Sequence, residues 1–89
     1  MTDKFPVHDD LDVIEGRTIF KSDGWWKAAV LYDGYHGHDI AIYLWKEESS
    51  RWKRKQKYVV HSREDWNDDR EAIEDLLVPL SQIQTSGEA

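Results

Sequence analysis

A stretch of eight residues, Arg51–Tyr58, combines the two kinds of side chain that bind single-stranded nucleic acid. Five of these residues are cationic and two are aromatic. Lysine and arginine neutralise backbone phosphates, while aromatic rings and guanidinium groups stack on unpaired bases. Lysines also protect the edge strands of sheets against aggregation, so this segment by itself leaves a binding strand and a protected edge strand as alternatives.

The pleat of a β-strand would sort these side chains onto two faces, because successive residues point to opposite sides. The lysine face would comprise Lys53, Lys55 and Lys57, and the opposite face Trp52, Arg54, Gln56 and Tyr58. We therefore expect the lysine face to follow phosphates, and rings and a guanidinium elsewhere on the sheet to stack on bases.

The rest of the chain offers little catalytic or metal-binding chemistry. One loop holds two histidines and two aspartates, namely Asp33, His36, His38 and Asp39. Their spacing matches no established metal-ligand pattern and is typical of a hydrated turn. His61 is expected to be a structural residue where a strand meets a helix. Since there is also no cysteine, nucleophile elbow or phosphate-binding glycine loop, we expect no enzyme activity, no metal and no cofactor.

Turn signals and apolar alternation predict four β-strands. They are expected at Val13–Phe20, Trp25–Tyr32, Ile40–Trp45 and Trp52–His61. An Asp-Gly pair in Lys21–Gly24 favours a tight turn, and two glycines mark a loop at Asp33–Gly37. The fold class is therefore expected to be α+β, a four-stranded antiparallel sheet followed by one C-terminal helix.

That helix is expected to begin at Ser62, which with Asp65 approximates a capping box. Pro79 is expected to end or kink it. Five apolar residues recur at helical spacing: Trp66, Ile73, Leu76, Leu77 and Leu80. The opposite face is acidic and is interpreted as solvated, with Asp68, Asp69, Glu71 and Asp75. Because the apolar face exceeds what a small sheet needs, we expect it to form the interface of a symmetric homodimer.

The third expected strand decides which rings are accessible. Ile40, Ile42 and Leu44 alternate along it with Ala41, Tyr43 and Trp45. If the aliphatic set faces the helix, Tyr43 and Trp45 lie on the face that one helix cannot cover. We expect these two rings to be exposed as a stacking platform. The alternative is that a second subunit, or the strongly curved sheet itself, buries them.

Length and composition indicate one small acidic domain. The 89 residues carry a formal net charge of −6 and include five tryptophans. We expect a flexible arm at 1–12, a folded domain at 13–80 and a flexible tail at 81–89. No apolar run reaches the roughly 20 residues that cross a bilayer, and no stretch resembles a signal peptide, so we expect a cytoplasmic protein without membrane contact.

Four short motifs follow one another between Gly24 and Leu80. They are Gly24-Trp25-Trp26-Lys27, the strand Asp39–Trp45 with its terminal tryptophan, the basic Lys53–Lys57 before Tyr58-Val59-Val60, and Ser62–Trp66 at the start of the helix. In this order they resemble the positive cofactor four family of transcriptional coactivators and its small prokaryotic relatives. The resemblance implies a curved sheet, dimerisation through the helices and binding of single-stranded or melted DNA on the sheets. It also implies binding roles for Lys27, Trp45, Trp52, Lys53, Arg54, Lys55 and Lys57.

Two functions from different classes are consistent with these features. The first is a homodimeric, sequence-tolerant domain that binds single-stranded DNA or RNA in transcription or repair, with the transcription machinery as a candidate partner. The alternative is a protein-interaction module of the same fold that binds a peptide or protein on its aromatic sheet face. A small enzyme or metal-binding domain built on His36 and His38 is a third interpretation.

Overall fold

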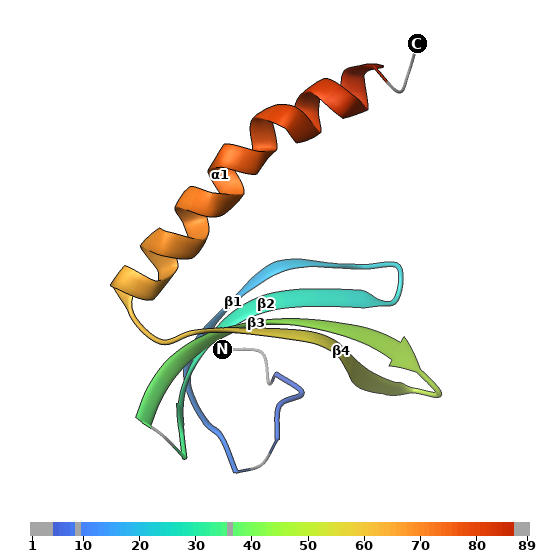
Figure 1. Cartoon of the computed structure of the whole chain (residues 1–89). Helices are drawn as coiled ribbons and strands as arrows, with labels where there is room; N and C mark the ends of the chain where they lie inside the picture. Colours follow the sequence, from blue (N-terminus) through green and yellow to red (C-terminus); the bar gives the residue numbers. More distant parts are fainter. Residues whose placement is uncertain (1–4, 9, 36, 87–89) are drawn as a thin grey trace.

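A computed structural model describes residues 5–8, 10–35 and 37–86 of the chain. Four strands precede one helix: β1 (Asp12–Ser22), β2 (Trp25–Gly34), β3 (Gly37–Glu48), β4 (Arg51–Val60) and α1 (Arg63–Ser86). The strands form one curved, open sheet in the order β1-β2-β3-β4, and each pair of neighbours is antiparallel (Figure 1). The α+β fold expected from the sequence is confirmed.

Tight turns join β1 to β2 and β3 to β4. Asp23 and Gly24 have φ values of 54° and 78°, and Ser49 and Ser50 have values of 52° and 65°. Two consecutive residues with positive φ are typical of the hairpin turns that match the right-handed twist of paired strands. These turns set the ends of the strands and place both hairpin tips at the same end of the sheet.

The two faces of the sheet follow the alternation of residues along β2 and β3. One face, called the inner face, carries the buried residues Trp26, Ala28, Val30, Tyr32, Ala41, Tyr43 and Trp45. The other, called the outer face, carries Ala29, Leu31, Ile40, Ile42 and Leu44 and lies on the side of α1 (Figure 1). The expected alternation in β3 is therefore correct: Ile40, Ile42 and Leu44 lie on the side of the helix, and Tyr43 and Trp45 lie on the other side.

The N-terminal segment packs under the inner face, which corrects the expectation of a loose arm for the described residues 5–8, 10 and 11. Phe5 is only 7% exposed, and Val7 and Leu11 pack against the same apolar cluster. The segment lacks regular secondary structure, so no periodicity marked it in the sequence. Because α1 lies on the outer side, these residues are what shields the inner face from water (Figure 1).

Side-chain hydrogen bonds define the start of α1. The amide of Asp65 donates to Oγ of Ser62 (3.1 Å), while the carboxylate of Asp65 accepts from the amide of His61 (3.1 Å). Ser62 is thus the N-cap as expected, and the reciprocal bond of the capping box reaches one residue further back. These bonds stabilise the junction between β4 and α1.

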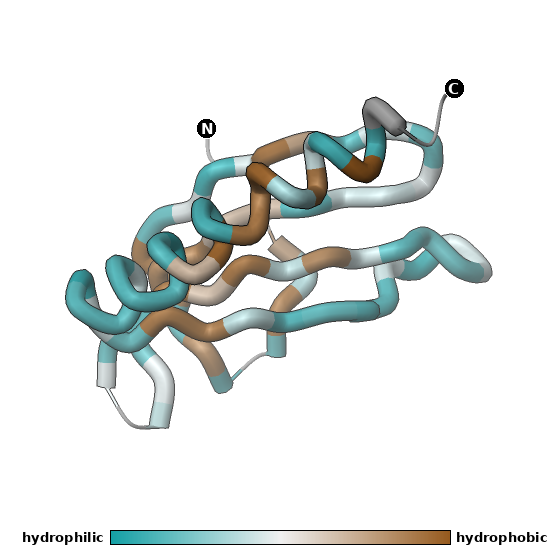
Figure 2. The backbone as a smooth tube through the Cα atoms, turned by 45° about the horizontal axis from the view of Figure 1, so that its top comes forward, coloured by the Kyte–Doolittle hydropathy of each residue, from teal (hydrophilic) through white to brown (hydrophobic). Residues whose placement is uncertain are grey.

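The expected end of the helix near Leu80 is wrong, because α1 passes through Pro79 and continues to Ser86. Proline removes one backbone donor and disfavours helical geometry at the preceding residue. Apolar residues nevertheless continue at helical spacing beyond it, with Leu80 followed by Ile83. Brown, hydrophobic stretches recur along the helix toward its C-terminal end (Figure 2). No helix in the described part of the chain combines the length and the apolarity needed to cross a bilayer.

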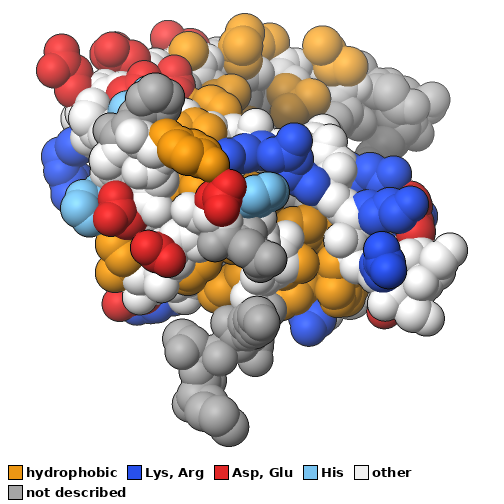
Figure 3. All heavy atoms as spheres, turned by 90° about the horizontal axis from the view of Figure 1, so that it is seen from below, with side chains coloured by type: hydrophobic (Ala, Val, Ile, Leu, Met, Phe, Trp, Pro, Cys, Tyr) orange, Lys and Arg blue, Asp and Glu red, His pale blue; other side chains and the backbone are white. Residues whose placement is uncertain are grey.

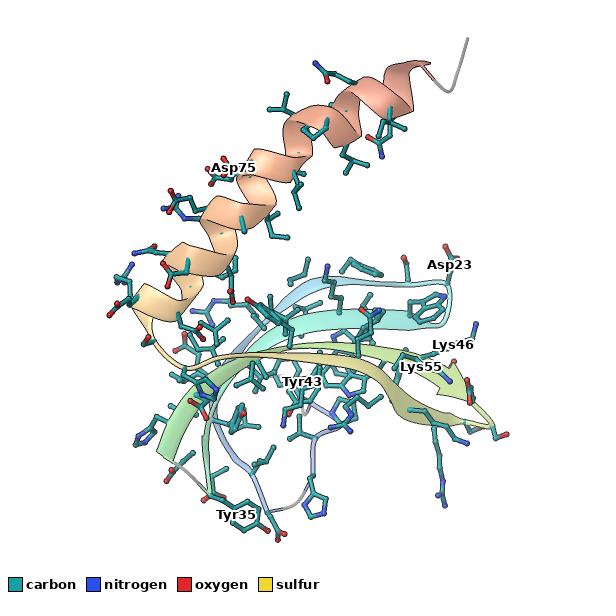
Figure 4. The ribbon with its side chains drawn as sticks, in the orientation of Figure 1. Asp23, Tyr35, Tyr43, Lys46, Lys55 and Asp75 are labelled. Carbon is teal, nitrogen blue, oxygen red and sulfur yellow. The ribbon has the colours of Figure 1, made fainter. Side chains whose placement is uncertain are left out.

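Helix α1 stands away from its own sheet. Among the described strands it approaches only β4, and it rises from the sheet at an open angle (Figure 1). Asp75 points away from the sheet (Figure 4), so helical periodicity turns the apolar residues Ile73, Leu77 and Leu80 toward the outer face. They remain exposed all the same, with Ile73 at 57%, Leu77 at 46% and Leu80 at 45%. The fold therefore leaves two facing apolar surfaces without contact between them.

Candidate nucleic-acid interface

Five aromatic rings pack together on the inner face. Trp26 is central, with ring centroids 5.1 Å from Trp45, 5.5 Å from Trp52 and 5.5 Å from Phe5. Tyr43 stacks on Trp45 at 5.0 Å with nearly parallel planes. Rings at these distances attract one another beyond simple burial, so they form a rigid aromatic floor across β2, β3 and β4.

Cationic side chains border this floor. Nζ of Lys21 lies 4.0 Å from the centroid of Trp26 and 5.6 Å from that of Trp52. On the other side, Nζ of Lys57 lies 5.4 Å from Tyr32 and 5.5 Å from Tyr43. Cations near ring faces are held by the ring quadrupole while their outer side stays hydrated. The inner face thus presents ammonium groups beside aromatic rings.

A β-bulge in β4 changes which basic residues share a face. Leu44 pairs with Gln56, but the next residue, Trp45, pairs with Arg54, so Lys55 is the extra residue. On the inner side of the bulge, Arg54 lies opposite Trp45 and Lys57 opposite Tyr43. The expected common face of Lys53, Lys55 and Lys57 is therefore wrong, because the extra residue shifts the alternation by one.

Lys53 and Lys55 make ion pairs with Glu48. Their Nζ atoms lie 3.8 Å from Oε1 and 2.8 Å from Oε2 of that carboxylate. The hydrogen bond from Lys55 lowers the pKa of Glu48, with smaller contributions from neighbouring lysine charges. Lys53 lies opposite Lys46 in the ladder, on the outer face. Two of the predicted phosphate contacts are thus partly neutralised and lie away from the aromatic floor.

Lys27 also lies on the outer face, where it pairs with Phe20 in β1 and Leu44 in β3. The structure therefore divides the predicted binding residues into two groups. The inner group is Tyr43, Trp45, Trp52, Arg54 and Lys57, and the outer group is Lys27, Lys53 and Lys55. Only the inner group shares one continuous surface with the aromatic floor.

The expected exposure of Tyr43 and Trp45 is wrong. They are only 2% and 0% exposed, because the N-terminal segment and the surrounding rings cover them. Burial raises the pKa of the Tyr43 hydroxyl, and the nearby charge of Arg54 opposes this effect. Figure 4 shows Tyr43 on the side of the sheet that faces the N-terminal segment. Accessible positions on this face are instead Arg54 and Lys57, with Trp52 half-buried.

Charge is distributed unevenly along the strands. The end with the hairpin tips carries the cations Lys21, Lys46, Arg51, Lys53 and Arg54 beside three carboxylates, Asp23, Glu47 and Glu48. The opposite end carries Asp10, Asp12, Asp33 and Asp39. Figure 3, which views the inner face, shows most Lys and Arg side chains toward its right and most Asp and Glu toward its left. β4 itself contains five cations and no carboxylate. A positive region therefore exists on the sheet although the whole chain is acidic.

Sequence reasoning missed several inner-face residues. The sequence pattern predicts Lys21 in a turn and Phe5 in the N-terminal arm. It predicts Trp26 in a strand but not the face of the sheet on which its side chain lies. Lys21 pairs with Trp26 in the ladder between β1 and β2, which places Lys21 beside the floor. Strand alternation puts Trp26, Ala28 and Val30 on one face, and this pattern could have assigned Trp26 to the buried face. Nothing local in the sequence indicated Phe5.

The histidines do not form a metal site within the described residues, where no group of three His, Asp or Glu side chains is close enough to hold an ion. His36, part of the metal interpretation, lies outside the described residues. His61 instead pairs with Asp39, with Nδ1 2.9 Å from Oδ1, and this hydrogen bond raises the pKa of His61. His61 thus lies where β4 meets α1, as expected for a structural residue.

A groove of about 430 Å³ separates the outer face from the first turn of α1. Its apolar lining includes Leu31, Ile40, Ile42 and Trp66, with His38 and Arg63 also contributing to its wall. The residues predicted to form a dimer interface continue from this groove along the helix. All five of them, Trp66, Ile73, Leu76, Leu77 and Leu80, are exposed in the single chain.

Comparison with protein-family models, with curated protein sequences and with solved structures finds no match to this chain. The resemblance to the positive cofactor four family therefore stays a hypothesis that depends on the motifs themselves.

Proposed function

We propose that this protein binds single-stranded nucleic acid on the inner face of its sheet and does so as a homodimer. The observation that carries the proposal is the combination of Lys21, Arg54 and Lys57 with an aromatic floor on one face of an otherwise acidic chain. Cations supply sequence-independent attraction to phosphates, and the half-buried ring of Trp52 at the border of the floor offers bases a surface for stacking. The function is binding, without a covalent step.

Three of the basic residues favour a polyanion as the ligand. Among the described residues, no carboxylate forms a salt bridge with Arg51, Arg54 or Lys57, whereas Lys53 and Lys55 are both held by Glu48. Uncompensated cations on an edge strand repel one another unless an anion lies along them. A single strand supplies regularly spaced phosphates together with bases, which suits the mixture of charges and rings better than a peptide does.

The dimer part of the proposal depends on the outer side of the molecule. An apolar helix face and an apolar sheet face point toward each other across the groove without packing, which is costly in water. The helix of a second copy could fill the space between them and cover both faces at once. This arrangement would leave the acidic helix face in solvent and keep both inner faces, each with its N-terminal segment, outside the dimer interface.

Fluorescence anisotropy with a labelled single-stranded oligonucleotide tests the binding function directly. We expect binding that weakens steeply as salt rises, together with weaker binding of a duplex whose bases are already paired and stacked. A labelled duplex of the same length is the matched control. If the protein shows no affinity for single strands at low salt, the proposal is wrong, and the protein-interaction module becomes the better interpretation.

A further inference from the structure

Phe5 fills a space in the inner face that the sheet itself leaves open. Gly16 in β1 lies opposite Val30 on this face, and its missing side chain leaves room above the strand. A Cβ atom at Gly16 would lie within 2.3 Å of Cε2 and 2.6 Å of Cζ of Phe5. The phenyl ring therefore occupies a slot bordered by Gly16 and by the rings of Trp26 and Trp45.

The ring in this slot is held by a short segment rather than by the sheet. The amide of Val7 donates to the carbonyl of Phe5 (2.8 Å), and the amide of Leu11 donates to the carbonyl of His8 (3.0 Å). Tyr35 in the β2–β3 loop donates its hydroxyl to the carboxylate of Asp10 (2.6 Å), which ties the far end of the segment to the sheet. Phe5 could thus leave the slot while Asp10 stays in place.

A polar group in the same cluster lacks a partner. Nε1 of Trp45 is fully buried, and no hydrogen-bond acceptor among the described residues reaches it. A buried N–H without an acceptor is rare in folded proteins, and often an unrecognised ligand or water explains it. The phenyl ring of Phe5, which stacks on Trp45, has no lone pair to offer. The carbonyl and phosphate oxygens of a nucleic-acid strand are acceptors of the kind that this N–H lacks.

We propose that the slot under Phe5 is a binding site for an unpaired pyrimidine base of a single strand, and that the base replaces the Phe5 ring. The inference rests on the proposed nucleic-acid function and specifies its ligand. A pyrimidine has a six-membered ring like phenyl and stacks on tryptophan, so it can take the place of Phe5 against Trp26 and Trp45. Lys21 lies beside the same ring of Trp26, where it can contact a neighbouring phosphate.

Competition between Phe5 and the base predicts a gain of affinity when the ring is removed. Since a binding-competent state that is rarely populated lowers apparent affinity, Phe5→Ala should bind labelled oligothymidine roughly 10- to 100-fold more tightly than the natural chain. Val7→Ala is the matched control, because it removes apolar contact from the same segment without emptying the slot. The double variant Phe5→Ala, Gly16→Ala should lose the gain, since the new Cβ fills part of the slot.

Three results would overturn the inference. A folded Phe5→Ala protein with unchanged affinity would overturn it and leave the proposed function intact. If neither the natural chain nor any variant binds oligothymidine at low salt, the proposed function and this inference both fail. An equal gain for an abasic oligonucleotide of the same length would also overturn it, because the gain must come from a base.

A measurement on the natural chain does not depend on whether the variants fold. The sequence has two phenylalanines, Phe5 and Phe20, so selective labelling gives two sets of ring signals by NMR. Stacking on Trp26 and Trp45 shifts the Phe5 signals, and addition of oligothymidine should move them toward free-phenylalanine positions. Phe20 belongs to the outer face and serves as the internal reference. Phe5 signals that stay in place while the oligonucleotide binds would overturn the inference.

Discussion

Replacing Lys57 by glutamine removes one cation from the inner face and leaves the bulge, the aromatic floor and the outer ion pairs unchanged. Nζ of Lys57 lies over the edge of the floor, 5.4 Å and 5.5 Å from the ring centroids of Tyr32 and Tyr43. Among the described residues no carboxylate forms a salt bridge with it. Its charge is therefore fully available to a phosphate, and the substitution should remove one phosphate contact.

The size of the effect follows from counterion release. Each phosphate neutralised on a single strand contributes about 0.7 to the slope of log affinity against log salt. With about 1 M salt as the reference where this contribution vanishes, loss of one contact weakens binding about eightfold at about 50 mM and about threefold at about 200 mM. The Lys57→Gln variant should therefore show a flatter salt dependence as well as lower affinity.

Lys55→Gln provides the matched control, since the same chemical change occurs two residues away on the same strand. Lys55 is the bulge residue, and Glu48 lies 2.8 Å from its Nζ, so its charge is already compensated. We expect its affinity to change by roughly twofold or less, because a compensated charge outside the contact surface is screened. Anisotropy titrations of both variants at four or more salt concentrations measure the slopes. Equal slopes for the two variants would refute the assignment of Lys57, rather than Lys55, to the binding face.

Three further predictions concern assembly, pH and capping. Leu77→Glu should convert a dimer to a monomer in sedimentation, whereas Asp75→Lys on the opposite helix face should not, and a monomeric natural chain at high concentration would contradict the dimer. The Asp39 hydrogen bond raises the pKa of His61, so its stabilising effect should be complete below about pH 6.5 and disappear as pH rises through the raised pKa. Denaturation midpoints of the natural chain and His61→Asn should therefore differ at low pH and converge at high pH. Ser62→Ala should lower the free energy of unfolding by about 1 kcal/mol through loss of the N-cap, whereas Ser62→Asn, which keeps a capping acceptor, should change it less.

The strands and the start of the helix were predictable because their signals are local. Alternation in β3, the Asp-Gly turn before β2 and the Ser62 cap each depend on residues within a few positions of one another. The faces of β3 also followed from alternation, since aliphatic residues interleave with Tyr43 and Trp45. The order of the strands followed from the short connections between them.

The face of each basic residue in β4 could not be predicted. The segment Arg51–Lys57 is almost uniformly polar, so no apolar phase fixes its register, and a single extra residue reverses the side to which every residue beyond it points. The bulge at Lys55 lies between the pairs Leu44–Gln56 and Trp45–Arg54, so it is defined by the pairing with β3. That information lies in another strand and not in the segment.

The position of Phe5 and the end of α1 were also missed, for different reasons. Phe5 packs against residues that are distant in sequence, and the segment around it has no period to indicate burial. Pro79 suggested a helix end, but continued apolar spacing at Leu80 and Ile83 accompanies a helix that runs on to Ser86. Proline disfavours helical geometry only at the residues next to it, whereas the length of this helix depends on the whole pattern of its apolar face.

The uneven charge of the inner face also limits how much of a strand one molecule can cover. On β4 the inner-face cations are Arg54 and Lys57, which lie roughly 10 Å apart along an extended strand. Beyond them this end of the sheet carries Asp12, Asp33 and Asp39, whose carboxylates repel a continuing phosphate chain. The footprint should therefore be short, near the lower end of the roughly 4–16 nucleotides that small single-strand domains occupy. On a long strand, successive molecules would therefore bind with gaps between them, because their acidic ends repel one another and disfavour cooperative binding.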